Sequence, residues 1–358
     1  MPEPHPIGVA LIGYGLAGKT FHAPLIKAAG MELLVFGSRD ANKVHADFPA
    51  AKVVADPIVA ATHPYAQLVV IASPNDSHVS LATAALQAGK HVVVDKPFTL
   101  TLAEARELAA LAASKKLLLS VFQNRRWDSD FLGLQAVLAE GRLGEVWQFE
   151  SNYNRYRMEI LGRWREQEVP GNGLWYDLGP HLVDQALQLF GLPQSVNATL
   201  IRQRPGAVAV DWCHVLLNYG ARRVILNISM VVSGGEPRFA VHGTGGSWIK
   251  YGLDTQEERL RAGAVPGEPG WGKDPQPAMF YPAGTPTPVQ LPAPPGDYRH
   301  YYSRIRDAIL KKAPNPVPPA QAIAVMAVLE AGLNSAATGQ TVSLPLTESE
   351  RANYLAGQ

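Results

Sequence analysis

The sequence predicts an α/β protein of two domains, in which a doubly wound parallel sheet is followed by a domain built on an antiparallel sheet. The chain has 358 residues, more than one hydrophobic core usually supports, so two domains are expected. As far as residue 121, short β-branched runs alternate with Ala/Leu-rich stretches of helical spacing. Beyond residue 125, strand-like runs follow one another without regular helices between them.

The first domain is expected at residues 1–124. Its apolar runs are nearly continuous, which is typical of parallel strands buried on both faces. The expected strands are residues 7–12, 33–36, 53–54, 68–72, 91–94 and 117–121. Six such strands, with helices between most of them, suit a nucleotide-binding domain.

The second domain is expected at residues 125–358. As an alternative, its C-terminal helices could pack against the first domain. A helix is predicted at 131–140, and an alternating, half-buried strand follows at 146–153. Further strands are predicted at 195–201, 212–219, 223–229, 239–241 and 248–251. The Pro/Gly-rich residues 262–296 indicate a long irregular excursion, and two apolar-periodic helices, 298–312 and 320–337, close the chain.

The composition indicates a small-molecule partner. Apolar residues make up 47% and charged residues 18%, and the net charge is +1, so neither nucleic acid nor an anionic membrane is an expected partner. Cys213 is the only cysteine, which excludes an intramolecular disulfide and a multi-cysteine zinc site and fits a reducing cytoplasm. The first fifteen residues lack a basic region ahead of an unbroken apolar run, so a cytoplasmic location is expected.

Three glycines follow the first predicted strand at the start of a helix. Gly13, Gly15 and Gly18 form the pattern G-x-G-x-x-G. In that context the first permits a tight turn, the second lets the backbone approach a pyrophosphate, and the third allows close helix packing. The loop therefore predicts a bound dinucleotide.

The end of the second predicted strand favours NADP over NAD. An NAD site places an acid here for the ribose hydroxyl, but the strand runs into Ser38 and Arg39. A hydroxyl and a guanidinium can bind a 2′-phosphate, which a carboxylate would repel. Asp40 keeps NAD open, because it could be the ribose acid if the strand ends two residues later.

Two segments carry acid–base side chains. Asp95-Lys96-Pro97 follows the fifth strand and places an ammonium at the edge where an α/β sheet binds its ligand. Asp177 and His181 are four residues apart and would share one face of a helix start, where the alternative is a structural histidine. Asp177, His181 and Asp184 could in principle bind a cation together. An imidazole base alone suffices for the oxidation of an alcohol, however, so no metal is expected.

The glycine loop, Asp95-Lys96-Pro97 and the segment from Asp177 to His181 together resemble the Gfo/Idh/MocA oxidoreductase family. The middle signature of this family usually has Glu where this chain has Asp95. Further runs resemble the NADP-dependent scyllo-inositol dehydrogenase branch: NRRWD at 124–128, YNRYR at 153–157, RWRE at 163–166 and IKYG at 249–252. The resemblance implies a Rossmann domain and a C-terminal α+β domain with a large, open, mostly antiparallel sheet. It also implies homodimers or homotetramers through that sheet.

The resemblance implies site residues as well. The catalytic residues would be Lys96, Asp177 and His181, with His181 as general base. The sequence does not decide whether His181 or Lys96 takes the proton from the substrate. The expected cofactor-binding residues are Gly13, Tyr14, Gly15, Leu16, Gly18, Ser38, Arg39, Ser73, Pro74, Asn75, His78, Asp95, Lys96, Asn124, Arg126 and Trp127. The expected substrate-binding residues are Lys96, Tyr153, Arg155, Arg157, Trp164, Asp177 and His181.

The expected activity is NADP-dependent hydride transfer at a hydroxyl or ketone of a cyclic polyol or sugar, with scyllo-inositol as the first substrate to test. A dehydrogenase of another sugar is the nearest alternative. A non-catalytic NADP-binding sensor and a glycosidase that recycles its cofactor on the same fold are the others.

Overall fold

The computed structural model describes residues 6–357, and these divide into two compact units. The first comprises the chain up to Trp127 together with Thr255–Trp271 and Asp297–Ile323. The second comprises Asp128–Asp254, Gly272–Gly296 and the chain from Ala324 onward. The sequence placed one boundary after residue 124; by contacts, two later segments also join the first unit.

The first unit is built on a six-stranded sheet in which every pair is parallel. Its strands are β1 (Gly8–Ile12), β2 (Glu32–Gly37), β3 (Lys52–Val54), β4 (Leu68–Ile71), β5 (His91–Val94) and β6 (Leu119–Val121). Their order, β3-β2-β1-β4-β5-β6, reverses direction between β1 and β4, and ligands bind at such a switch point. The predicted Rossmann fold is confirmed.

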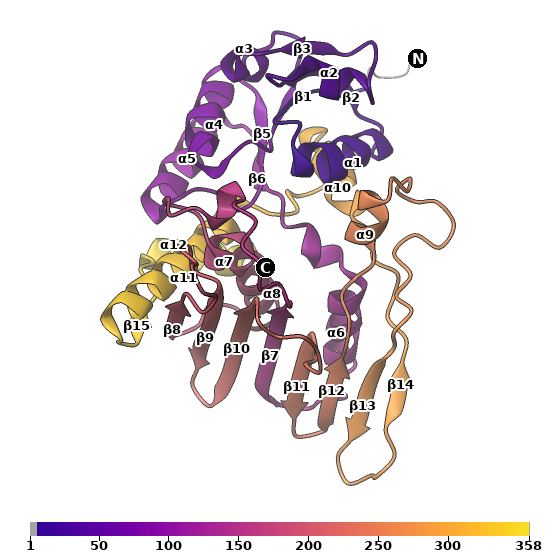
Figure 1. The fold of residues 1–358 in the computed structure, drawn as a ribbon, viewed down its shortest axis with the longest axis vertical. Helices are drawn as coiled ribbons and strands as arrows, with labels where there is room; N and C mark the ends of the chain where they lie inside the picture. Colours follow the sequence, from indigo (N-terminus) through magenta and orange to yellow (C-terminus); the bar gives the residue numbers. More distant parts are fainter. Residues whose placement is uncertain (1–5, 358) are drawn as a thin grey trace. The chain divides into compact units, whose positions relative to one another are not determined.

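Helices cover both faces of this sheet. They are α1 (Ala23–Ala28), α2 (Ala41–His45), α3 (Pro57–Ala61), α4 (His78–Gln87) and α5 (Leu102–Lys115), with α9 (Gln256–Arg261) and α10 (Arg299–Ile309) from later in the chain. Figure 1 shows α4 and α5 on one side of the sheet and α1 and α10 on the other. The helix α5 begins at a capping box, in which Thr101 and Glu104 each bond the other's backbone N–H.

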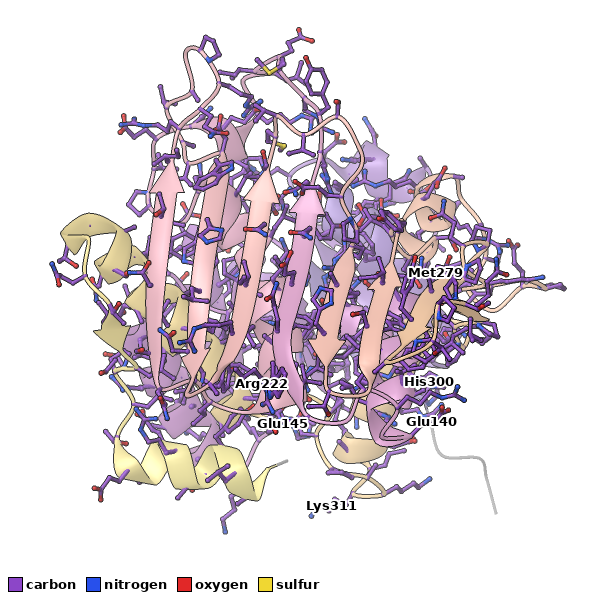
Figure 2. All side chains as sticks on the ribbon, turned by 90° about the horizontal axis from the view of Figure 1, so that it is seen from below. Glu140, Glu145, Arg222, Met279, His300 and Lys311 are labelled. Carbon is purple, nitrogen blue, oxygen red and sulfur yellow. The ribbon has the colours of Figure 1, made fainter. Side chains whose placement is uncertain are left out.

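The second unit is built on a nine-stranded sheet, which runs across the lower part of Figure 1 in the order β14-β13-β12-β11-β7-β10-β9-β8-β15. In chain order the strands are β7 (Val146–Asn154), β8 (Ser195–Ile201), β9 (Trp212–Tyr219), β10 (Arg222–Ser229), β11 (Phe239–Gly243), β12 (Gly246–Lys250), β13 (Ala278–Pro282), β14 (Val289–Leu291) and β15 (Val342–Ser343). The sheet is mostly antiparallel, as predicted, but β7 and β10 pair in parallel. Glu145 and Arg222, which lie where these two strands begin, are accordingly neighbours at one end of the sheet (Figure 2).

The prediction of an entirely irregular segment at 262–296 is wrong, because this segment contains β13 and β14. Its proline and glycine content hides short strands that add to the edge of an existing sheet. A proline fits at Pro282 because it is the last residue of β13, beyond the residues that pair with the edge strand β14. A buried ion pair also holds the segment to β12: Nζ of Lys250, the last residue of that strand, lies 3.1 Å from the Asp274 carboxylate.

The remaining α-helices are α6 (Ser129–Ala139), α7 (Leu174–Asp177), α8 (Gly179–Phe190), α11 (Pro319–Thr338) and α12 (Glu348–Ala356). Trp175 is buried among them and donates its indole N–H to the Leu329 carbonyl at 3.0 Å. Gly179 and Gly332 face this indole so closely that a Cβ on either would lie within 3 Å of it. The helix α11 is long and apolar enough to cross a membrane, but 61% of its apolar 18-residue stretch is buried within the protein, as in a core helix.

Candidate active site

The glycine loop joins β1 to the helical segment that continues as α1. Gly13 has φ +91°, a conformation that disfavours any side chain, and its N–H bonds the Gly37 carbonyl at 2.9 Å. A Cβ on Gly18 would lie 2.0 Å from the Gly13 carbonyl oxygen. The packing of the loop itself therefore requires the first and third glycines.

Gly15 differs from its two neighbours in the motif. Its φ lies outside the left-handed region, and a Cβ added to it would have no atom within 4 Å. The fold itself therefore does not require a glycine at this position. A side chain here would fill the open space over the backbone. An open backbone at the start of a helix suits the pyrophosphate of a dinucleotide, and the residues therefore fit that cofactor.

The end of β2, where an NAD site places an acid for the ribose, has no carboxylate at its last residue. The strand β2 ends at Gly37, and Ser38 and the exposed Arg39 follow it. Asp40 caps α2, where its carboxylate accepts the Lys43 N–H at 3.1 Å. Its backbone N–H lies 3.2 Å from the Ser38 hydroxyl. The one acid that kept NAD open is thus engaged by its own helix.

Tyr14 and Leu16, the residues between the glycines, point to different surroundings. Tyr14 is buried edge-on against Phe36, and its hydroxyl donates to Asp47 at 2.8 Å, whereas Leu16 is exposed. Lys19 lies 2.7 Å from Asp47, and chiefly through this contact it lowers the pKa of the Asp47 carboxyl. The carboxylate that lies behind the loop is therefore neutralised by a cation of the same turn.

The loops after β4 and β5 are joined by a buried histidine. His78, the first residue of α4, places Nδ1 2.9 Å from the Pro97 carbonyl oxygen and Nε2 3.1 Å from that of Ser73. Burial lowers the pKa of His78, although Asp95 and the carbonyl groups act in the opposite direction. Because both nitrogens contact backbone, we expect His78 to act on a cofactor only through the two loops. Lys96 is half-buried beside them.

Other expected cofactor residues lie near these loops or after β6. Pro74 precedes a 3₁₀ turn that contains Asn75. Asn124 and Trp127 are buried, and Trp127 packs edge-on against Tyr301 of α10, with ring centroids 5.9 Å apart. Arg126 donates to the Pro316 carbonyl and to the Gln321 side chain at 2.7 Å. Trp127 and Arg126 thus have contacts with the later segments of the first unit.

The second unit carries the other expected catalytic residues. Asp177 ends α7 and His181 lies in the first turn of α8, so the prediction of one helix start is wrong. Pro180 explains the break, because it has no N–H to continue the helical hydrogen bonds. His181 is buried, and Asp177 is half-buried with an oxygen 3.4 Å from Nε of Arg165. Because Lys96 belongs to the first unit, a common centre for all three remains a prediction.

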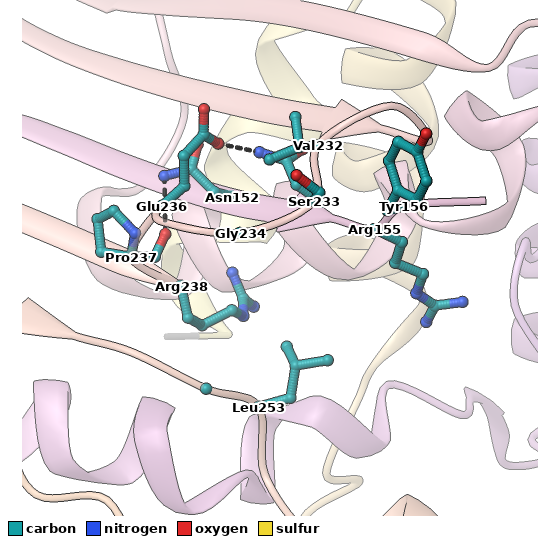
Figure 3. Close-up of a pocket in the computed structure, with 12 residues that line it drawn as sticks. Asn152, Arg155, Tyr156, Val232, Ser233, Gly234, Glu236, Pro237, Arg238 and Leu253 are labelled. Atoms are coloured by element: carbon teal, nitrogen blue, oxygen red, sulfur yellow. Dashed lines mark hydrogen bonds between the residues drawn. The ribbon is translucent and has the colours of Figure 1, made fainter. Parts of the chain in front are cut away.

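A pocket of about 240 Å³ lies in the second unit at the carboxyl ends of β7 and β10 (Figure 3). Among the expected substrate residues only Arg155 lines it. Tyr153 is buried, with the guanidinium carbons of Arg155 and Arg238 5.1 and 5.4 Å from its ring centroid. Arg157 lies beyond the end of β7, and Trp164 is exposed with Arg165 over its ring.

Most lining residues of this pocket were missed by sequence reasoning. They bring amide, hydroxyl, carboxylate and guanidinium groups together: Asn152, Asn154, Ser233, Glu236 and Arg238. Asn154 donates to Glu236, and Asn152 donates to the Pro237 carbonyl at 2.9 Å (Figure 3). Such donors and acceptors suit a polyhydroxylated ligand. The residues from 232 to 238 reach the end of β7 because both of their flanking strands pair with it, β10 in parallel and β11 antiparallel, and the sequence does not reveal these pairings.

One buried network links this pocket to the helix of His181. Arg238 donates to Ser151 of β7 at 2.6 Å and to Gln185 of α8 at 2.7 Å. Its Nε lies 3.7 Å from the buried Asp130. Gln185 is one turn after His181, so this guanidinium holds the first turns of α8 against the sheet. Within residues 6–357, no group of three or more His, Cys, Asp or Glu side chains has metal-binding geometry.

The fold and the glycine loop define a dinucleotide-binding protein of the Rossmann class. Comparison with protein families specifies the class further. Residues 7–123 match the oxidoreductase family's NAD-binding Rossmann fold, and residues 135–344 match the C-terminal alpha/beta domain of the same family. The chain belongs to the Gfo/Idh/MocA oxidoreductase family, which confirms the resemblance found in its motifs.

The relatives span nearly the whole chain. The oxidoreductase YdgJ of Escherichia coli is 52% identical over 94% of this chain and 99% of its own. The scyllo-inositol 2-dehydrogenase (NADP⁺) IolW of Bacillus subtilis is 38% identical over 94% of this chain and 96% of its own. A crystal structure of an oxidoreductase from Klebsiella pneumoniae is 53% identical, with a TM-score of 0.93 over 98% of both chains. The chain is thus similar throughout its length to oxidoreductases, one of which is named as an inositol dehydrogenase.

Proposed function

We propose that the chain is an NADP-dependent dehydrogenase that oxidises a secondary hydroxyl of a cyclic polyol or sugar, with scyllo-inositol as the leading substrate. The observation that carries the cofactor choice is the end of β2. Ser38 and Arg39 follow the strand there, while Asp40 caps α2. A guanidinium matches the geometry of a 2′-phosphate, and the nearest carboxylate, that of Asp40, is held by the backbone of its own helix instead of facing a ribose hydroxyl.

Two lines support the substrate class. The relative IolW is named for scyllo-inositol and for NADP⁺. Within the second unit, the pocket at the end of β7 presents Asn152, Arg155, Ser233 and Glu236, side chains that can bond vicinal hydroxyl groups. The proposal extends to the reverse direction, the reduction of the corresponding ketone.

In the proposed reaction, His181 is the general base and takes the proton of the substrate hydroxyl. Lys96 donates to the same oxygen and stabilises the negative charge that develops as the proton leaves. Asp177 orients the base or bonds a substrate hydroxyl. When bound, the nicotinamide supplies the acceptor for the hydride from the substrate carbon, so the alcohol becomes a ketone and one proton is released to His181.

The cofactor choice is tested with Arg39→Ala. An exposed charge-assisted hydrogen bond contributes about 1.5 kcal/mol, so KM for NADP should rise about tenfold while KM for NAD stays within about twofold. The matched control is Asp40→Asn, since asparagine also caps helices but carries no charge. An equal effect of Arg39→Ala on both cofactors, or a weakening of NAD alone by Asp40→Asn, would contradict the assignment to NADP.

The oligomer remains a proposal as well. Along β10, Val224, Leu226 and Ile228 are buried, whereas the alternate residues Ile225 and Asn227 are half-buried on the other face of the sheet. We propose that this second face joins copies of the chain as a homodimer or homotetramer. Sedimentation velocity should give a multiple of 38.6 kDa, and Ile225→Arg should shift it toward the monomer. A wild-type monomer at micromolar concentration would contradict this.

A further inference from the structure

A buried histidine that the expected catalytic residues do not include lies next to the Lys96 loop. The side chain of His22 is 0% exposed. His22 is the last residue of a π-helical turn, Gly18–His22, which begins at the third glycine of the loop and closes with a bond from the Ala23 N–H to the Gly18 carbonyl. Such wide turns insert one residue into a helix and occur frequently at functional sites.

The ring of His22 contacts the carboxylate that precedes Lys96. Its Nε2 lies 3.6 Å from Oδ2 of Asp95, and Oδ1 of the same carboxylate accepts the Lys96 N–H at 2.8 Å. One oxygen of Asp95 therefore faces the histidine while the other holds the backbone of Lys96. The Asp95 side chain is only 13% exposed, so water contributes little to its orientation.

A tyrosine fixes the tautomer of this histidine. Nδ1 of His22 lies 2.5 Å from the hydroxyl of Tyr302 in α10. We take the Tyr302 hydroxyl as the donor to Nδ1, because the opposite tautomer would leave the buried Nε2 without a proton while it faces the Asp95 carboxylate. With Nδ1 accepting, the ring carries a proton on Nε2, 3.6 Å from Oδ2 of Asp95, which is an electrostatic contact longer than a hydrogen bond. Phe122 packs on the ring, with centroids 4.4 Å apart, and restricts its rotation.

We propose that His22 is a positioning residue for the reaction: held by Tyr302, it orients Asp95, and through Asp95 it fixes the backbone of Lys96. The inference rests on the role proposed above for Lys96. It also joins two parts of the site, because the same turn carries Gly18 of the cofactor loop at one end and His22 at the other. Without the imidazole, the Asp95 carboxylate can rotate and the Lys96 N–H loses its acceptor.

The first test is kinetic. In His22→Leu we expect kcat to fall about 10- to 100-fold, since small misplacements of a reacting group have effects of that size, while KM for NADP stays within about threefold. His22→Gln should keep most of the activity, because its amide can donate to Asp95. The matched control is His63→Leu, which removes another buried histidine of the same unit, one that contacts Lys52 instead. Its kcat should be unchanged.

The second test needs neither cofactor nor substrate. Hydrogen exchange of the Lys96 amide should be about tenfold faster in His22→Leu than in the wild type, and unchanged in His63→Leu. A third test is again kinetic: in an Asp95→Asn background, adding His22→Leu should change kcat by less than about twofold, because both substitutions break one chain of contacts. Fully additive losses, or unchanged amide exchange in His22→Leu, overturn the proposal.

The two proposals fail differently. If Lys96→Ala keeps wild-type activity, the role of Lys96 and with it the positioning of a catalytic group are wrong, even where amide exchange responds to His22. If Lys96→Ala abolishes turnover while His22→Leu leaves both kcat and amide exchange unchanged, the proposed function stands and only the role of His22 is wrong.

Discussion

Replacement of Gly15 by alanine separates what the fold requires from what the cofactor requires. A Cβ at Gly15 would have no atom within 4 Å, and its φ is not left-handed, so the fold accepts it without strain. Replacing glycine by alanine at a compatible position stabilises a protein by about 0.4–1 kcal/mol. Gly15→Ala should therefore leave the melting temperature unchanged or raise it by roughly 2 °C.

The same methyl group occupies the space over the backbone where we expect the pyrophosphate. Loss of one charge-assisted hydrogen bond costs about 1.5–3 kcal/mol, so Kd for NADP should rise about 10- to 150-fold. The matched control is Gly18→Ala, whose Cβ would lie 2.0 Å from the Gly13 carbonyl oxygen. Relieving that contact should cost about 1–3 kcal/mol and lower the melting temperature by roughly 2–10 °C.

The assays are isothermal titration with NADP and thermal unfolding of the protein without cofactor. If Gly15→Ala unfolds at as low a temperature as Gly18→Ala, the space over Gly15 is not open. If Gly15→Ala binds NADP within about twofold of the wild type, that space does not hold the pyrophosphate. Either result would refute the role assigned to this loop.

Two further predictions concern buried charges. Arg125 and Arg261 lower the pKa of Glu257 to about 2 despite burial, which by itself raises it. The folded pKa is below the unfolded value of 4.5, so the stabilisation by the charged Glu257 is complete above pH 4.5 and is lost as the pH falls toward 2. The difference in unfolding free energy between wild type and Glu257→Gln, measured in urea, should therefore narrow by about 1 kcal/mol between pH 7 and 3.5. A constant difference would contradict this. Asp274→Ala leaves the buried Lys250 ammonium without its partner and should cost about 3–5 kcal/mol, most of which Lys250→Met with Asp274→Leu recovers; a loss below 1 kcal/mol in Asp274→Ala would contradict the pairing.

Local sequence patterns predicted the first unit well because its strands are buried on both faces. The run from Leu68 to Ile71 is apolar at every position, as is typical of a strand covered by helices on both sides, and the glycines mark the end of β1. Both signals are local in the sequence. The strand boundaries moved by one or two residues, as at residue 117, where β6 begins instead at Leu119.

The features that the sequence hid depend on distant pairing. The strands β13 and β14 exist because β12 offers an edge to pair with, and their Pro-rich composition gave no periodic signal. The pocket residue Glu236 reaches the end of β7 because it precedes β11, which pairs antiparallel with β7, in a loop that begins at β10 on the other side of β7. The contact of His22 with Tyr302 joins residues 280 positions apart, and no pattern near either residue announces it. Pro180, by contrast, was a readable sign that Asp177 and His181 do not share one helix.

The measurement that tests the proposed reaction most directly is the appearance of reduced nicotinamide absorbance when the purified protein is mixed with NADP and scyllo-inositol. We expect steady turnover, one NADPH for each ketone formed, and a kcat/KM at least tenfold lower with NAD. His181→Ala should reduce kcat about a hundredfold or more, as general base groups contribute about 10²–10⁴. Tight binding of NADP without turnover on scyllo-inositol or any other polyol or sugar would contradict the proposed function and favour a sensor.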